Sequence, residues 1–318
     1  MKTLDIVATG HLSIDHIRTP GTGVYREALG GSSAYVSFSA RKLGAQAGVI
    51  SEIGADFPDT CMKTLRQEGI DLFGLKEVKD AATTSFTLTY SNEKRKLTLK
   101  SRAPLIGLED VALDFSSRII HVAPIAGEIS SEVVRTLRAK TDMLSLDPQG
   151  FLRQFDAEGR TRLKKWKADG VLEQVDVYKS SLREAEAVTG KRNAKTAMET
   201  LENIGIKTVI ITLGEEGALL RFDKTSHRIP AFSPGKLVDP TGAGDVFAGA
   251  FLAECLHKKD LLWCACVGSA AASFKVETFG PVLGATKLAI YRRAEVLFEM
   301  VYAGRDAQRV KGALSERE

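Results

Sequence analysis

Cysteine is scarce in this sequence, and its spacing fits neither a metal site nor a disulfide framework. The 318 residues include four cysteines, and Cys264 and Cys266 are separated by one residue with no second pair nearby. Zinc sites and disulfide frameworks need further paired cysteines or histidines. The five histidines show no ligand spacing either. We therefore expect free thiols in a reducing cytoplasm.

Long hydrophobic runs and basic clusters are also missing. No window approaches the roughly 18 apolar residues of a membrane-spanning helix. The first residues, MKTLDIVATGH, carry Asp5 in an apolar run that is too short for a secretory signal. The net charge is only +4, and lysine and arginine are spread along the chain. We expect a cytoplasmic protein without a membrane or nucleic-acid partner.

Two common nucleotide-binding loops are missing as well. Gly190-Lys191 and Gly235-Lys236 are not followed by serine or threonine, so neither forms a Walker A loop. The run that starts at Gly242 begins like the nicotinamide fingerprint G-x-G-x-x-G. Phe247 stands at its third glycine, however, and the run lies late in the chain. This argues against a nicotinamide oxidoreductase.

What the chain does contain is an alternation of short apolar runs with longer helical patterns. This order predicts a mostly parallel sheet with helices on both faces. No low-complexity linker or internal repeat is present, so we expect a single α/β domain over residues 1–318. Strands are predicted at residues 4–9, 48–52, 119–123, 143–146, 175–178, 208–212 and 218–221, and helices at 31–43, 58–68 and 130–140.

Residues 83–101 follow a different pattern. Phe86, Leu88 and Tyr90 alternate with serine and threonine, and a second alternating run follows a polar tip. Alternation with a period of two predicts a β-hairpin. Such a hairpin either extends one edge of the main sheet or stands off the domain as a small lid.

The segment VDPTGAGDVFAG contains three glycines and two aspartates within twelve residues. We expect Thr241 to cap a helix whose first turn contains Gly242, Ala243 and Gly244. Unpaired N–H groups at a helix start attract anions, and glycine lets a phosphate approach closely. The sequence T-G-A-G alone fits an ordinary helix start equally well. Asp245 beside an anion site adds a base for a substrate hydroxyl, which favours phosphoryl transfer.

The whole segment resembles the C-terminal signature of the ribokinase-like (phosphofructokinase B) sugar kinases, D-[TP]-[TN]-G-A-G-D-x-F, at every position. The resemblance implies that Asp245 is the general base. It also implies that the amides of Gly242, Ala243 and Gly244 form the anion hole, and that Thr241 lies near the phosphates of ATP.

Other segments resemble the acceptor site of this family. Gly30 and Gly31 match a glycine pair that opens a helix, and GHLSIDHI matches a strand end whose aspartate, here Asp15, binds sugar hydroxyls. Tyr35 replaces the asparagine of many relatives and either stacks on a sugar or fills space. SLDPQG is similar to a D-P-N-x-R element, with Gln149 in place of asparagine and no arginine at the expected position.

Three more segments resemble the ATP and metal side of the family's site. YKSSLREAEAVTG is similar to an N-x-x-E segment whose glutamate helps to organise Mg²⁺ through water, and ITLGEEGALL matches a T-x-G-x-x-G turn. CACVGSAAASF either lines an adenine pocket or packs tightly against the sheet. The implied residues are Lys179, Ser181, Thr212, Gly214, Gly217, Thr241 and Ser269 for ATP, Glu184 for Mg²⁺, and Asp239 for a possible monovalent cation.

The resemblance extends from about residue 4 to residue 281. It implies a three-layer α/β sandwich with a mostly parallel central sheet and a small β lid, formed by segments at about 12–30 and 83–102. The lid covers the acceptor and can pair with a second lid in a homodimer. The implied activity is an ATP-dependent, Mg²⁺-assisted kinase of a small sugar, polyol or nucleoside. We expect an unphosphorylated acceptor, with myo-inositol and nucleosides both open.

A non-catalytic sugar or nucleotide sensor on the same fold is the alternative function. A sensor has no need of a general base, so the intact Asp245 and glycine run argue against it. ADP release with any acceptor separates the two.

Overall fold

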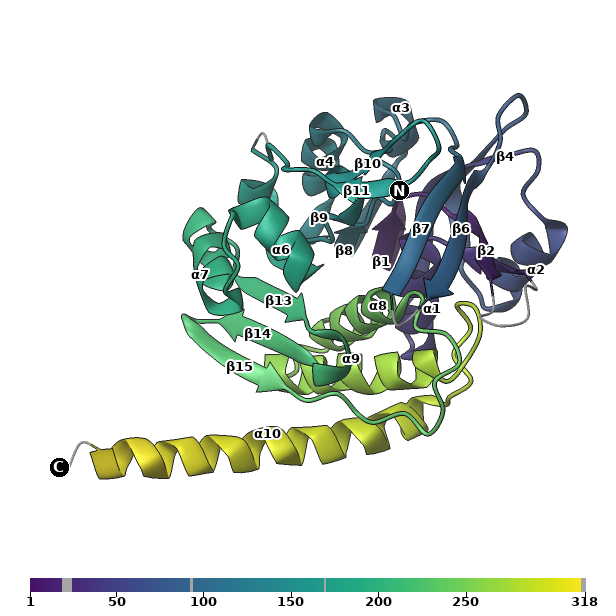
Figure 1. Cartoon of the computed structure of the whole chain (residues 1–318). Helices are drawn as coiled ribbons and strands as arrows, with labels where there is room; N and C mark the ends of the chain where they lie inside the picture. Colours follow the sequence, from purple (N-terminus) through teal and green to yellow (C-terminus); the bar gives the residue numbers. More distant parts are fainter. Residues whose placement is uncertain (19–24, 92–93, 169, 316–318) are drawn as a thin grey trace.

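The computed structural model describes residues 1–18, 25–91, 94–168 and 170–315, and strands alternate with helices over most of them (Figure 1). The strands are β1 (Lys2–Thr9), β2 (Ser13–Arg18), β3 (Tyr25–Gly30), β4 (Ala47–Gly54), β5 (Asp71–Val78), β6 (Thr84–Ser91), β7 (Lys94–Ser101), β8 (Phe115–Val122), β9 (Thr141–Leu146), β10 (Arg153–Phe155), β11 (Thr161–Leu163), β12 (Val177–Ser181), β13 (Thr208–Thr212), β14 (Ala218–Phe222) and β15 (Thr225–Ile229). The helices are α1 (Ser32–Lys42), α2 (Asp59–Gln67), α3 (Leu108–Val111), α4 (Ser131–Arg138), α5 (Gln149–Leu152), α6 (Leu182–Thr189), α7 (Ala194–Ile204), α8 (Ala243–Cys255), α9 (Leu261–Val276) and α10 (Lys287–Ser315).

The central sheet has nine strands in the order β15-β14-β13-β12-β9-β8-β1-β4-β5. The strands from β13 to β5 run parallel, whereas β14 and β15 are antiparallel additions at one edge. The chain leaves β1 first for β4 on one side and later for β8 on the other. Such a switch point opens a crevice at the carboxyl ends of the strands, where ligands bind.

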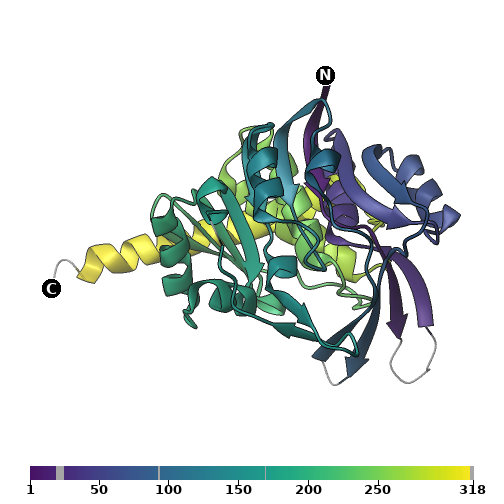
Figure 2. The same cartoon turned by 90° about the horizontal axis from the view of Figure 1, so that it is seen from above.

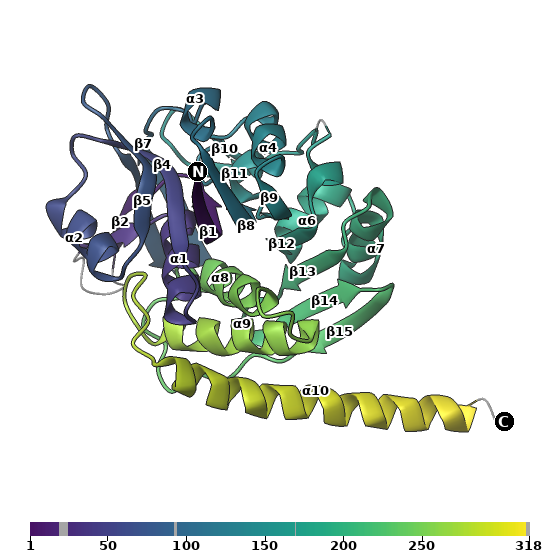
Figure 3. The ribbon, with the colours of Figure 1, turned by 180° about the vertical axis from the view of Figure 1, so that it is seen from behind.

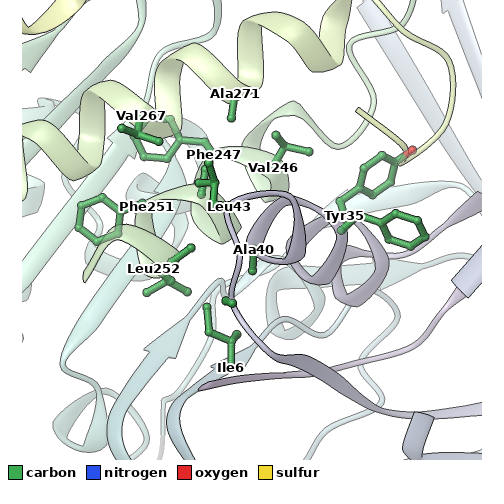
Figure 4. Packing of buried hydrophobic residues seen from close by; sticks show 14 of the residues in the cluster. Ile6, Tyr35, Ala40, Leu43, Val246, Phe247, Phe251, Leu252, Val267 and Ala271 are labelled. Atoms are coloured by element: carbon green, nitrogen blue, oxygen red, sulfur yellow. The ribbon is translucent and has the colours of Figure 1, made fainter. Parts of the chain in front are cut away.

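Helices cover both faces of this sheet, as the alternation predicted (Figure 3). Ile6 and Ile119 belong to a core cluster shared with α1, α8, α9 and α10. Their chain neighbours Val7 and Ile120 belong to a second cluster shared with α4, α6 and α7. Neighbouring residues of a strand point to opposite faces, so each apolar run stabilises both layers. Figure 4 shows the first cluster from close by.

The hairpin forms a separate sheet rather than an edge of the central one. Strands β6 and β7 join β2 and β3 in the order β3-β2-β6-β7. The hairpin projects from the body in Figure 2. The buried side chains Ile17, Phe86 and Leu88 of the four-stranded sheet pack on Ile125 and Ala126 from the body. This cluster is the apolar contact between the small sheet and the body. The predicted tip at residues 92–93 lies outside the described residues.

Two strands at the edges of the central sheet were not predicted. In β5 and β15 most residues are half-buried or exposed. Partly exposed strands carry polar residues, so these two lack the unbroken apolar run that predicts a central parallel strand. The four cysteines are free thiols, as expected, and none of the described helices has the length and hydrophobicity needed to cross a membrane.

Candidate active site

The glycine-rich segment forms the N-terminus of helix α8. Gly242 is the N-cap residue, with φ of 77°, and the helix begins at Ala243. The prediction that Thr241 caps this helix is therefore wrong, because the helix begins one residue later. Only glycine adopts a positive φ without strain, and a Cβ on Gly242 would also overlap the Tyr35 ring. The first-turn N–H groups thus follow a turn that no other residue type fits.

Asp245 lies in the first turn of α8 and contacts a polar side chain. The Gln149 amide Nε2 donates to its Oδ1 at 3.2 Å and to the Ser32 hydroxyl at 2.7 Å. Burial raises the pKa of Asp245 above its ordinary value, and the positive charge of Lys179 opposes that rise. A carboxylate with a raised pKa is a stronger proton acceptor, as a general base requires.

Lys179 and Asp147 form a buried ion pair beside the glycine turn. Lys179 Nζ lies 2.6 Å from Asp147 Oδ2, and Asp147 Oδ1 accepts from the Gln149 backbone N–H at 3.1 Å. Burial opposes the charge of Lys179, but the carboxylates of Asp147 and Asp245 hold its pKa above the ordinary value. A Cβ on Gly244 would lie 2.8 Å from Lys179 Nζ. The ammonium group therefore lies directly against the helix start.

The predicted acceptor residues surround a cavity that reaches Asp245. Asp15 is buried, and its carboxylate accepts from the Ser13 hydroxyl at 2.8 Å. A Cβ on Gly30 would overlap that carboxylate, and Gly31 starts α1 with φ of 92°. The cavity is lined by Ser13, Asp15, Gly31, Ser32, Tyr35, Phe86, Leu88, Leu97, Ile125, Gln149, Arg153, Thr241, Gly242 and Asp245. One cavity therefore joins residues from both ends of the chain and from the small sheet.

Arg153 lines this cavity and was not predicted. Its guanidinium group donates to the Gln149 side-chain oxygen and, at 2.8 Å, to the Ile125 carbonyl oxygen. The arginine sought two residues after Gln149 is absent, and Arg153 stands four residues after it. Because residues 149–152 form the helical turn α5, positions 149 and 153 lie on one side. Ser32 and the apolar lining residues were also missed, because nothing local in the sequence marks them.

The nucleotide-side residues gather at the carboxyl ends of β12 and β13. Ser181 and Thr212 are register partners on these two strands. Ser181 and Glu184 form a capping box at the start of α6, in which Glu184 Oε2 accepts from the Ser181 backbone N–H at 2.8 Å. The S-x-x-E spacing signals this box in the sequence. Gly214 and Gly217 form the turn into β14 with positive φ.

Packing accounts for the small residues of α9. The Ser269 hydroxyl donates to the Pro230 carbonyl oxygen at 2.7 Å. A Cβ on Gly268 would lie 3.0 Å from the Phe247 carbonyl oxygen of α8. These contacts support the tight-packing interpretation of the segment, and an adenine-binding role for Ser269 stays a prediction.

The two predicted metal residues differ in what they offer an ion. Within the described part of the chain, no three His, Cys, Asp or Glu side chains gather as a metal site. Magnesium in kinases needs only one or two carboxylates besides the phosphates, and the half-buried Glu184 fits that role. Asp239 does not fit a monovalent cation, because the ammonium group of Lys275 lies on its carbonyl and carboxylate oxygens.

Comparisons with known proteins agree with this geometry. The model of the pfkB family carbohydrate kinases matches residues 3–287. The chain is 28% identical over 284 residues to the cytidine kinase of Thermococcus kodakarensis, covering 87% of this chain and 98% of that kinase. It is 27% identical over 297 residues to a nucleoside kinase of Methanothermobacter thermautotrophicus, covering 87% and 90%.

Among solved structures, the fold is similar to a pyrophosphate-dependent kinase in the ribokinase family, complexed with a pyrophosphate analogue and myo-inositol. The TM-score is 0.78 at 24% identity, with 90% of this chain and 99% of that one covered. The likeness shows the fold and agrees with the expected α/β architecture.

Proposed function

Because the chain belongs to the pfkB family of carbohydrate kinases, and is thus a phosphotransferase with an alcohol acceptor, we propose that it transfers the terminal phosphoryl group of ATP to a hydroxyl group of a nucleoside or another small sugar or polyol. The observation that carries this proposal is the position of Asp245. Its carboxylate shares one cavity with Asp15 and adjoins the N–H groups at the start of α8.

In the proposed mechanism Asp15 orients the acceptor by accepting hydrogen bonds from its hydroxyl groups. Asp245 takes the proton of the reacting hydroxyl. The amides of Gly242, Ala243 and Gly244 hold the charge that develops on the transferred phosphoryl group. Lys179, whose ammonium group lies against Gly244, adds a fixed positive charge.

The donor side is proposed at the carboxyl ends of β12 and β13. Ser181, Thr212, Gly214 and Gly217 would hold ATP there, with Thr241 near its phosphates, and Glu184 would hold Mg²⁺ through water. Magnesium, when bound, neutralises charge on the phosphates.

The small sheet is proposed to act as the lid, because its residues Phe86, Leu88 and Leu97 line the acceptor cavity. A closed lid excludes water, so that the phosphoryl group reaches the substrate and not solvent.

A nucleoside is the acceptor that we favour. The cavity has one apolar side, formed by Phe86, Leu88, Leu97 and Ile125. Its hydrogen-bonding side includes Asp15. The flat face of a nucleobase suits the apolar side, and the hydroxyls of a ribose suit the hydrogen-bonding side. The curated relatives named above are cytidine and nucleoside kinases, which supports this choice.

The experiment is a panel of nucleosides, sugars and polyols assayed for ADP release with ATP and Mg²⁺, and repeated with pyrophosphate as donor. Asp245→Asn should lower kcat by about 10²–10⁴-fold, the usual contribution of a general base, with ATP affinity near normal by titration. Asp142→Asn, at an exposed aspartate, is the control. Retained turnover in Asp245→Asn rejects the assignment of the base, and binding without turnover across the panel favours a sensor.

A further inference from the structure

Lys275, near the end of α9, is a lysine with no solvent exposure. Its Nζ lies 3.0 Å from the Asp239 carbonyl oxygen, 3.4 Å from Asp239 Oδ2 and 3.0 Å from the Thr278 carbonyl oxygen. Lysine is almost never fully buried unless it is paired. The contacts are therefore a built arrangement rather than a side chain folded away by chance.

The contacts identify the charge state of Lys275. All three partner atoms are oxygens that only accept hydrogen bonds here, so the nitrogen must donate to each of them. Three N–H donors belong to the ammonium form, whereas a neutral amine has two. Burial lowers the pKa of Lys275, and the Asp239 carboxylate opposes this by favouring the charge. The geometry therefore indicates a buried cation.

This cation lies behind the turn that precedes α8. Asp239 Oδ1 accepts from the Thr241 backbone N–H at 2.9 Å, and the Val238 N–H donates to the Val276 carbonyl oxygen at 2.7 Å. The same Lys275 Nζ lies 5.7 Å from the centroid of the Tyr35 ring. That ring contacts Gly242 so closely that no Cβ fits between them. A shift of the ammonium group would thus move both the chain before Gly242 and the ring behind it.

We propose that the ammonium group of Lys275 is a built-in cation that takes the place of a monovalent metal ion at Asp239 and holds the turn at residues 239–242 in position for phosphoryl transfer. A metal ion on the same oxygens would lie a few ångströms from Nζ. Two unit charges about 4 Å apart repel by roughly 4 kcal/mol at an effective dielectric constant of 20. Lys275 and a metal ion therefore exclude each other, and Lys275 is a positioning residue.

The test compares the parent protein with Lys275→Ala in sodium, potassium, ammonium or choline chloride at constant ionic strength. The parent should show the same Tm and kcat in all four salts. Lys275→Ala should melt lower in choline and lose at least tenfold in kcat. Potassium or ammonium should raise both values in a saturable way, because the vacated oxygens can accept a small cation. Arg221→Ala is the control, because it removes another buried cation, one that pairs with Glu202. Its Tm should be lower than that of the parent, and potassium should not restore it.

Activation of the parent by potassium, or a Lys275→Ala variant with unchanged kcat and Tm, would overturn the proposal. If Lys275→Ala does not fold, the proposal is tested with Lys275→Met, whose longer side chain fills more of the space. The salt series on the parent protein tests it independently. The activity readout rests on the proposed function, but the melting readout does not. Absence of turnover in every protein would count against the proposed function alone. The effect of potassium on the Tm of Lys275→Ala would still test the proposal about the cation.

Discussion

Charged groups lie on two sides of the turn at residues 239–245: one side adjoins the acceptor cavity through Asp245, and the other is sealed. Asp245 and the Lys179–Asp147 pair stand on the cavity side. Lys275 stands on the sealed side, where it is fully buried and its Nζ contacts oxygens of Asp239 and Thr278. Asp245 is therefore placed where it could exchange a proton with a molecule in the cavity, whereas Lys275 can act only on the turn.

The comparison also separates two uses of a buried lysine. Lys179 pairs with the buried carboxylate of Asp147 and lies against Gly244, at the helix start proposed to hold the phosphoryl group. Lys275 contacts the backbone of the turn from behind. A cation near reacting atoms lowers a barrier, while the role proposed for the cation behind the turn is to position its N–H groups.

The largest expected effects come from exchanging Asp147 and Asp245, the two aspartates near Lys179, for asparagine. Asp147→Asn leaves Lys179 buried without its partner and should destabilise the fold by about 3–5 kcal/mol.

Asp245→Asn should instead stabilise the fold. Its pKa is raised by burial, so the ionised group costs stability at any pH above that value. Thermal melts at pH 7–8 should show a higher Tm for Asp245→Asn, and this gain should shrink as the pH falls through the raised pKa.

An intermediate effect is expected from Gly242→Ala, which disturbs the turn itself. The change combines a positive φ with a clash against Tyr35. We expect about 1 kcal/mol from conformation, about 1–3 kcal/mol from overpacking, and a roughly 100-fold lower kcat because the N–H groups shift. Gly170→Ala is a matched control, since it has the same φ of 77° and no atom within 4 Å of an added Cβ. Equal losses in both variants would show that the Tyr35 contact does not matter.

The smallest effect is expected at the small sheet. Leu97 is half-buried and lines the acceptor cavity. Leu97→Ala should cost about 1–2 kcal/mol, at or below the low end for leucine truncation. It should raise KM for the acceptor several-fold while KM for ATP stays unchanged. Leu113→Ala, at an exposed leucine outside the cavity, should leave the KM for the acceptor and the KM for ATP unchanged. A rise in KM for ATP would contradict the lid role of this sheet.

Much of the fold was predictable, because it follows from local periodicity. The apolar runs around Ile6, Ile119 and Ile210 mark central strands, and all three occur where expected. The alternation through Phe86 and Leu88 predicts the hairpin that forms β6 and β7. The edge strands β5 and β15 escaped prediction, since their residues are only partly buried and carry no clear period.

The site was predictable where its residues sit in one segment. Gly242, Ala243, Gly244 and Asp245 form a single helix start, as expected, and their catalytic roles stay predictions. Arg153 was missed because a short helical turn, and not a motif, brings it back beside Gln149. Glu184 was expected at a metal ion, which stays a prediction; its capping box with Ser181 shows that it has a local structural role.

By itself the sequence determined the order of strands and helices, the hairpin, and a helix start suited to an anion with an acid beside it. These features depend on neighbours a few residues apart, whose spacing is written into the chain. Only the tertiary structure decided that Tyr35 packs on Gly242, and that Lys275 reaches Asp239 across 36 residues. Those contacts depend on how α1, α8 and α9 pack on one face of the sheet, and packing of distant segments leaves no local pattern.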